Sequence, residues 1–198
     1  KKPIRLAISK PGSSDVWVFE KVMVHYGLCS GAKIEECYKA WEAAGAKFFR
    51  GSYSEQAGAF KDRNVDGTFT FLALPGASIT EASVGRDLKL LAFPKPLLEY
   101  LGKFGMGEGV IPAGTYPKAV NGNEPVVSAT MGTTITVSSK MSNDTAYTLA
   151  KTLNDNADRV RKIHGSLSDY EPAKGYLYLG VALHPGAEKY YKEKGWLK

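Results

Sequence analysis

Apolar and polar positions alternate along the first hundred residues in blocks that predict strands and helices in turn. The apolar run from Ile4 to Ile8 is typical of a buried strand, and after a polar turn Phe19, Val22 and Met23 recur at helical spacing. Because short connections join such blocks, we expect an α/β fold with an open, mostly parallel sheet flanked by helices. Further strands are predicted at 46–51, 68–74 and 88–93, and further helices at 33–44, from 54, at 78–84 and at 94–104.

The pattern changes after Gly105. Residues 110–117 are extended and contain two prolines, and β-rich runs at 125–129 and 133–138 predict two more strands. Helical patterns follow from Ser142 to the C-terminus. We therefore divide the chain into an α/β ligand-binding lobe, 1–116, and a second part, 117–198, with hinge or crossover strands and C-terminal helices.

Composition limits the class of protein. Of 198 residues, 43% are hydrophobic and 23% charged, as in folded globular proteins. No apolar run approaches the roughly 20 residues that cross a membrane. The net charge of +6 is spread over solvated helix faces, so we expect no nucleic-acid partner. The chain starts without Met or a signal peptide, which we interpret as a processed or truncated product or an isolated domain.

The two cysteines, Cys29 and Cys37, are eight residues apart. They form a local disulfide if the compartment is oxidising and remain free thiols if it is not, and the sequence leaves both open. The three histidines show no ligand spacing with them. We expect no metal and no cofactor.

The first candidate site is the turn Gly12-Ser13-Ser14, between the first strand and the first helix. Gly12 allows a positive φ, the serines supply hydroxyl donors, and a helix N-terminus supplies backbone N–H groups. Such a turn favours a carboxylate, phosphate or sulfate, although each exposed contribution is only about 0.3–1 kcal/mol. The alternative is an ordinary βα turn without a ligand.

A second turn, Leu74-Pro75-Gly76, also follows a predicted strand. Ligands of open α/β sheets bind beyond the carboxyl ends of the strands, so the two turns could face one crevice. Tyr116 lies where the α/β half gives way to the extended segment, and its ring either lines the cleft or packs under Pro117.

Catalytic motifs are weak. Ser30-Gly31-Ala32-Lys33 matches Ser-x-x-Lys, but without the accompanying motifs of acyl-transfer enzymes. Ser13 has no identifiable base, and His184, before Pro185, is expected to cap or pack. We expect a binding protein and not an enzyme; the alternatives are an enzyme of unknown reaction and a non-binding structural or antigenic fragment.

Taken in order, several motifs resemble the TAXI family of solute-binding proteins that serve TRAP-type transporters. The most specific lies near the C-terminus. The motifs are Pro11-Gly12-Ser13-Ser14, Ala73-Leu74-Pro75, Ile111-Pro112-Ala113-Gly114-Thr115-Tyr116-Pro117, and Leu183-His184-Pro185-Gly186-Ala187 followed by Tyr190-Tyr191 and Lys192-Glu193-Lys194-Gly195.

The resemblance implies a type II periplasmic-binding fold, in which two α/β lobes close on a small organic anion or amino acid, with a glutamate-like dicarboxylate favoured. It implies a periplasmic location, TRAP membrane subunits as partners, and an N-terminal portion missing from this chain. It also implies that Gly12, Ser13 and Ser14 face the ligand, together with Leu74, Pro75 and Gly76.

The chain departs from the family pattern at two places. The family turn is usually Gly-Ser-Gly-Thr, whereas here Asp15 follows Ser14. If Asp15 points inward it opposes an anion and suits an amine; if it caps the helix the anion site is unaffected, and we favour capping. The run before Pro75 includes Phe71, which we count among the ligand-facing residues because bulk there makes the pocket apolar or small.

Overall fold

A computed structural model describes residues 3–31, 34–177 and 180–198, and the chain forms two compact units, Lys1–Thr130 and Met131–Lys198. The division predicted at residue 116 stays a prediction. In the first unit the elements are β1 (Arg5–Ile8), α1 (Ser14–His25), α2 (Ile34–Ala43), β2 (Lys47–Arg50), α3 (Tyr53–Lys61), β3 (Gly67–Thr68), α4 (Ala77–Gly85), α5 (Lys95–Gly102), β4 (Gly107–Ile111) and β5 (Val126–Thr130). In the second they are α6 (Asn143–Asp155), α7 (Ala157–Arg161), the 3₁₀ turns η1 (Gly165–Leu167) and η2 (Pro172–Lys174), and α8 (Pro185–Glu193).

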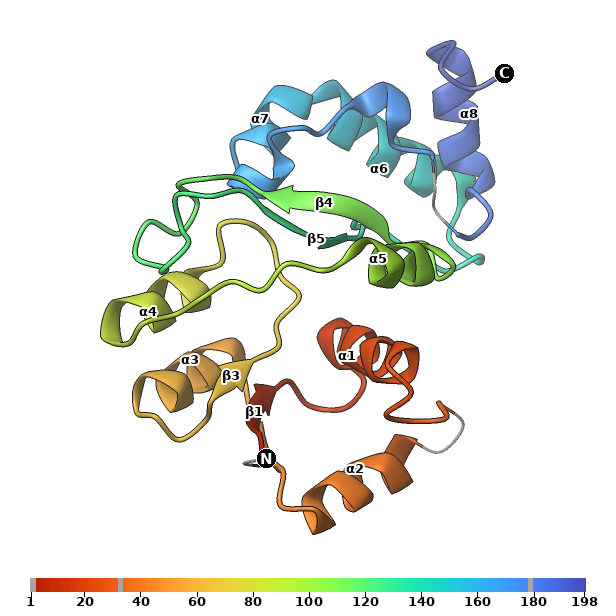
Figure 1. Cartoon of the computed structure of the whole chain (residues 1–198). Coiled ribbons are helices and arrows are strands. Elements are labelled where there is room, and N and C mark those ends of the chain that lie inside the picture. The colour runs from red at the N-terminus through yellow and green to blue at the C-terminus, as the bar shows by residue number, and fades with distance from the viewer. Residues whose placement is uncertain (1–2, 32–33, 178–179) are drawn as a thin grey trace. The chain divides into compact units, whose positions relative to one another are not determined.

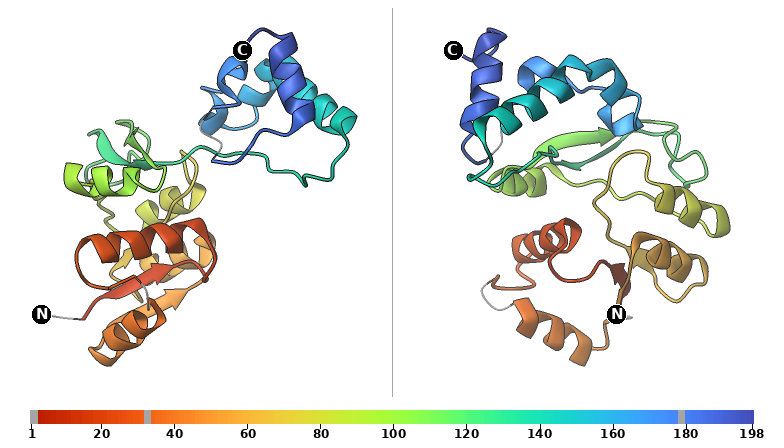
Figure 2. Two further views of the ribbon diagram at one scale, coloured as in Figure 1. Left: turned by 90° about the vertical axis from the view of Figure 1, so that its right-hand side faces the viewer. Right: turned by 180° about the vertical axis from the view of Figure 1, so that it is seen from behind.

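A three-stranded parallel sheet forms the centre of the first unit. β1 lies between β2 and β3, and Leu6 pairs with Phe48 on one side and with Gly67 on the other. Figure 1 shows α1 and α2 on one side of β1 and α3 on the other, and Figure 2 shows the same elements from two further directions. The expected parallel sheet flanked by helices is therefore confirmed.

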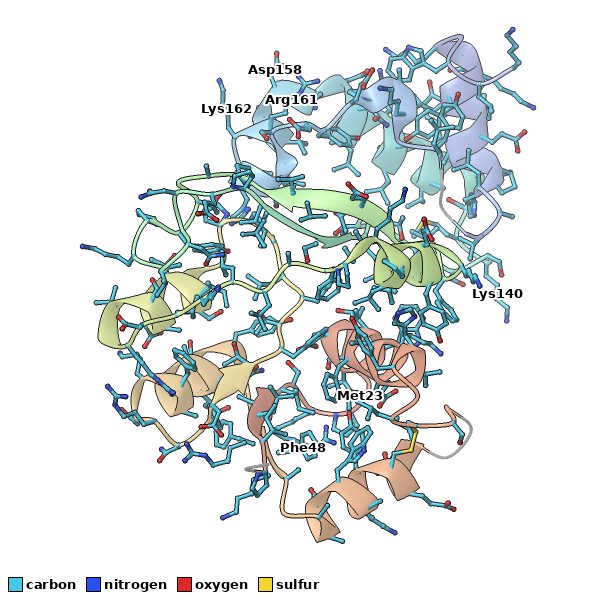
Figure 3. All side chains as sticks on the ribbon, viewed as in Figure 1. Met23, Phe48, Lys140, Asp158, Arg161 and Lys162 are labelled. Carbon is cyan, nitrogen blue, oxygen red and sulfur yellow. A yellow bond between two sulfur atoms is a disulfide. The ribbon has the colours of Figure 1, made fainter. Side chains whose placement is uncertain are left out.

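Successive side chains of β1 point to opposite faces of the sheet and pack against different helices. Leu6 and Ile8 pack with Phe19 of α1 and Tyr38 of α2, whereas Ala7 packs with α3 and its neighbours. A continuous run of apolar residues in a strand therefore places apolar side chains on both faces of the sheet, and both faces are buried. Figure 3 labels Met23 and Phe48, which pack against the α1–α2 cluster.

Two predicted strands are absent from the structure. Residues 88–93 lie beside the β4–β5 pair without joining a sheet: Leu88 accepts a hydrogen bond from the N–H of Val120, and Leu90 pairs with the side chain of Asn121. Residues 133–138 form no strand, and Ile135 is 64% exposed. β propensity is expressed only where a strand finds a partner and a packing face, and 133–138 has neither. The predicted strand at 125–129 is confirmed as β5, which pairs antiparallel with β4.

The second unit is helical. α6 packs against α8, where Tyr190 and Tyr191 are buried. Ser142 caps α6 as predicted, since its hydroxyl accepts from the N–H of Thr145 at 3.1 Å. His184 caps α8: its Nδ1 accepts from the N–H of Gly186 at 3.2 Å, which confirms the capping role expected for this histidine.

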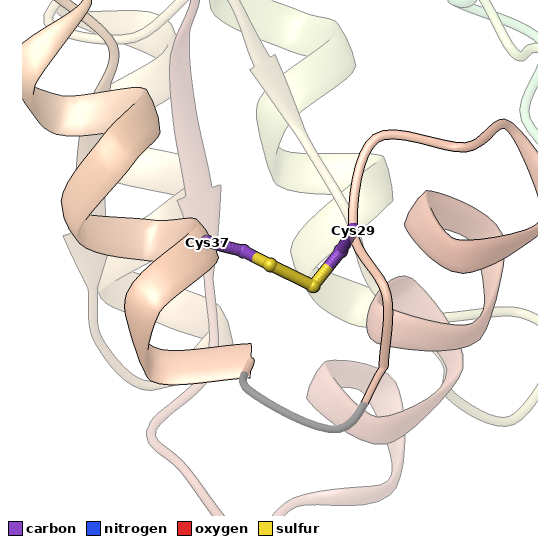
Figure 4. Close-up of a disulfide and its surroundings, with 2 residues drawn as sticks. All are labelled: Cys29 and Cys37. Carbon is purple, nitrogen blue, oxygen red and sulfur yellow. A yellow bond between two sulfur atoms is a disulfide. The ribbon is translucent and has the colours of Figure 1, made fainter.

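Cys29 and Cys37 form a disulfide (Figure 4), which settles the alternative that the sequence left open. The bond joins the segment after α1 to the first half of α2. Its closed loop is short, with eight residues of sequence separation, so it fixes the connection between two helices on the same face of the sheet.

Candidate functional site

The turn after β1 has the conformation that its sequence predicts. Gly12 has φ +89°, a value that favours glycine, and Ser13 is the N-cap residue of α1. The Ser13 hydroxyl donates to the carbonyl of Lys10 at 2.8 Å, and the Ser13 N–H donates to the same oxygen at 3.3 Å. Ser13 therefore holds the turn closed instead of capping the helix with its side chain.

Backbone donors remain at the start of α1. Within the described part of the chain, the N–H groups of Ser14, Asp15 and Val16 make no backbone hydrogen bond, as the first turn of a helix dictates. This helix has 12 residues, so its dipole adds positive potential at the same end. The arrangement suits a carboxylate oxygen.

An open depression of about 520 Å³ lies at this end of α1. Its lining combines the three residues of the predicted turn with side chains from one stripe of the helix. Trp17 supplies an aromatic side chain and Glu20 a carboxyl group. Burial first, and the charge of Glu35 second, raise the pKa of Glu20, while Arg50 and Lys21 lower it by smaller amounts. The lining residues are Gly12, Ser13, Ser14, Val16, Trp17 and Glu20.

The second predicted turn is tied to Tyr116. Gly76 is the N-cap residue of α4, and its N–H donates to the Tyr116 hydroxyl at 2.7 Å. The Tyr116 ring is 2% exposed and packs with the core on the α3 side of the sheet, where Leu74 also packs. Burial raises the pKa of Tyr116, and the Gly76 N–H lowers it by a smaller amount. The ring therefore packs in the core, and whether it also lines a cleft or packs under Pro117 stays a prediction.

The structure does not gather all the predicted residues around one cavity. Among the described residues, those lining the depression include the first turn but none of Phe71, Leu74, Pro75, Gly76 or Tyr116. Phe71 is half-buried, and Pro75 is exposed after a cis Leu74–Pro75 bond. The ligand-binding role of these residues, and of Gly12, Ser13 and Ser14, stays a prediction.

The favoured capping role of Asp15 is wrong. Asp15 is the second residue of α1 and not its cap, and its side chain is fully buried. Neither carboxylate oxygen has a hydrogen-bond partner in the part of the chain that the structure describes. The helical pattern does place position 15 on the buried face with Phe19, because four residues return to the same side of a helix. Capping was expected because aspartate is among the preferred residues at a helix N-terminus.

Asp15 has polar neighbours that the sequence did not single out. Burial first, and the Asp15 carboxylate second, raise the pKa of Tyr53, while the Ser9 hydroxyl lowers it. Ser9 and Gln56 are both buried, and the Gln56 amide donates to the Ser9 hydroxyl at 3.1 Å. In the sequence these residues are marked only by their place: Ser9 directly follows β1, and Tyr53 and Gln56 lie in the first turn of α3, the helix after β2.

Two other expectations concern chemistry. No group of three acidic, histidine or cysteine side chains in the described residues could hold a metal ion. Ala32 and Lys33 of the Ser-x-x-Lys match lie outside the described residues.

The described helices include none that is both long enough and apolar enough to cross a membrane.

The chain matches a known protein family. A family model described as the NMT1-like family matches residues 29–195. It is a periplasmic-binding-like family, consistent with a solute-binding role. The matched span includes the turn at Leu74–Gly76 and Tyr116, and it begins after the Gly12–Ser14 turn.

Proposed function

This chain belongs to the NMT1-like family, and from that premise we propose that it is the extracytoplasmic receptor of a TRAP-type transporter of the TAXI class. Its solute is a small organic acid or amino acid, with a glutamate-like dicarboxylate favoured. The membrane subunits of the transporter are its protein partners. The order of the Gly12-Ser13-Ser14, Leu74-Pro75 and His184-Pro185-Gly186 motifs supports the finer assignment.

The start of α1 is the single observation that carries the proposal. Ser14 and Val16 line the depression together with Gly12 and Ser13, and within the described residues their N–H groups make no backbone hydrogen bond. Hydrogen bonds from such groups to a carboxylate are charge-assisted and stabilise a complex by roughly 1.5–3 kcal/mol each.

Binding without covalent chemistry is supported by the bonding of Ser13. A nucleophilic serine donates its proton to a base, whereas the Ser13 hydroxyl donates to the backbone carbonyl of Lys10. The proposed periplasmic location is supported by the Cys29–Cys37 disulfide, because disulfides persist in oxidising compartments such as the bacterial periplasm.

Titration calorimetry with L-glutamate tests the proposal. Ser13→Ala removes the hydroxyl that closes the turn, and we expect affinity to fall about tenfold or more, since 1.4 kcal/mol is a factor of ten. Gly12→Val is expected to be worse, because a β-branched residue disfavours the φ of +89° found there. Ser54→Ala, an exposed serine in α3, is the matched control and should bind like wild type.

The result against the proposal is equally clear. If Ser13→Ala and Gly12→Val both fold and bind as wild type does, the solute site lies elsewhere and the turn after β1 only connects a strand to a helix.

A further inference from the structure

Three buried acceptor atoms without donors lie in the first turns of α1 and α3, the helices that follow β1 and β2. They are both carboxylate oxygens of Asp15 and the amide oxygen of Gln56, and none has a partner among the described residues. The Asp15 and Gln56 side chains are 0% and 1% exposed. Leaving a buried acceptor unsatisfied is costly, and leaving a buried charge unpaired costs more, so this cluster is incomplete as it stands.

The orientation of Gln56 is fixed by its surroundings. Its Nε2 donates to the carbonyl of Gly51 at 3.0 Å and to the hydroxyl of Ser9 at 3.1 Å. A carbonyl can only accept, so the NH₂ group must face Gly51, and the amide oxygen must lie on the other side. Flipping the amide would not satisfy the cluster.

The cluster lies where two crossovers separate. The chain leaves β1 through Ser9 towards α1 on one face of the sheet, and it leaves β2 through Gly51 towards α3 on the opposite face. In the strand order β2-β1-β3 the topological switch point, where open α/β sheets bind ligands, lies at the carboxyl ends of β1 and β3. The segment after β3 contributes as well, because Tyr53 of α3 donates its hydroxyl to the carbonyl of Phe71 at 3.2 Å, and the Asp15 carboxylate is among the groups that raise the pKa of Tyr53.

We propose that Asp15, Gln56 and Ser9 form a subsite for a primary ammonium group of the solute. An ammonium has three donors and no acceptor, which matches three acceptors without donors. Its single positive charge matches the one carboxylate of the cluster. This inference rests on the proposed function and refines it, since it selects amino acids and amines over organic acids that lack nitrogen.

Other occupants fit less well. Calcium, for example, takes six or more oxygen ligands, and several of them are usually carboxylates. This cluster offers one carboxylate. The N-terminus of α1 stabilises Asp15 through its dipole, but the carboxylate accepts no N–H from it within the described residues. Tyr53 is 36% exposed, so we infer that a solute group would approach Asp15 from solvent past the Tyr53 ring.

Methylammonium chloride tests the subsite without knowledge of the natural solute. We expect the unfolding temperature of the 198-residue chain to rise with methylammonium concentration, relative to sodium chloride at the same ionic strength. Tetramethylammonium chloride carries the same charge without donors and should behave like sodium chloride. Asp15→Asn should abolish the methylammonium response, whereas Glu42→Gln, which neutralises an exposed acid of α2, should retain it.

Stability without any ligand adds an independent readout. Because Asp15 is a buried carboxyl group without a hydrogen-bond partner among the described residues, Asp15→Asn should unfold at the same temperature as wild type or higher. A large loss of stability in Asp15→Asn would show that Asp15 is a structural residue and would overturn the proposal. Equal responses to methylammonium, tetramethylammonium and sodium would overturn it too, as would a methylammonium response that survives in Asp15→Asn.

A matched pair of solutes separates this inference from the proposed function. Glutarate is L-glutamate without its ammonium group. We expect L-glutamate to bind wild type about tenfold or more tightly than glutarate, and Asp15→Asn to lose that preference. Glutarate binding as tightly as L-glutamate would overturn the ammonium subsite and leave the receptor function standing. Binding of neither, with an intact methylammonium response, would contradict the favoured solute class and leave the subsite standing.

Discussion

Removing the hydroxyl of Tyr116 is the sharpest test of how the second turn is held. The Tyr116 oxygen accepts the N–H of Gly76 at 2.7 Å, and both groups are buried. In Tyr116→Phe the ring still fills its place in the core, but the Gly76 N–H loses its acceptor. Only the hydrogen bond and a small volume are lost, so the variant isolates one interaction.

The expected cost follows from burial. A buried donor left without an acceptor costs about 1–3 kcal/mol, whereas an exposed one finds water. The matched control is Tyr53→Phe, because its hydroxyl donates to the Phe71 carbonyl from a ring that is 36% exposed. We expect about 2 kcal/mol for Tyr116→Phe and under about 0.5 kcal/mol for Tyr53→Phe.

Two readouts decide the outcome. Urea unfolding, followed by the fluorescence of Trp17 and Trp41, measures the stability of the first unit, which contains these two residues and Tyr116. Amide hydrogen exchange gives the local effect, and the Gly76 amide should lose protection in Tyr116→Phe only. If Gly76 keeps its protection and stability is unchanged, the Tyr116–Gly76 bond does not hold the turn and the reasoning fails.

Three further predictions concern other parts of the chain. His184→Ala should destabilise the second unit by about 1 kcal/mol through loss of a helix cap, His184→Asn should restore most of it, and urea unfolding measures both. Reducing the Cys29–Cys37 bond should lower stability by about 2–3 kcal/mol, since its closed loop is short; a Cys29→Ser/Cys37→Ser variant checks this without reductant. Hydrogen bonds from Lys151 first, then Lys194 and Tyr190, hold the pKa of Asp155 well below its ordinary value. Stability from Asp155 is therefore present above the ordinary aspartate pKa and lost as the pH falls towards the lowered one, so thermal unfolding of Asp155→Asn should vary less with pH in that range.

Strong periodicity made much of the fold predictable. The first strand, its Gly-Ser turn and the helix after it are found as expected, because alternation and helical spacing agree with local turn chemistry there. Ser142 and His184 were predictable as caps, because each precedes a helix with a side chain that can accept an N–H.

Long-range partners could not be predicted. The β-branched run at 133–138 has the composition of a strand, yet nothing in the sequence states whether another strand lies beside it. The same limit applies to Asp15. Aspartate is a residue type that often caps helices, but the burial of this side chain depends on how α1 packs against the rest of the unit. The Tyr116–Gly76 bond joins residues 40 positions apart, which no local pattern encodes.

Ligand-dependent stability tests the receptor function most directly. Thermal unfolding of the chain is measured with a panel of small dicarboxylates and amino acids that includes L-glutamate and glutarate, in wild type and in Ser13→Ala. We expect at least one member to stabilise wild type, by about 2.7 kcal/mol at 100 times its Kd, and Ser13→Ala to need about tenfold more of it for the same effect. No stabilisation by any member of the panel, or equal stabilisation of wild type and Ser13→Ala, would contradict it.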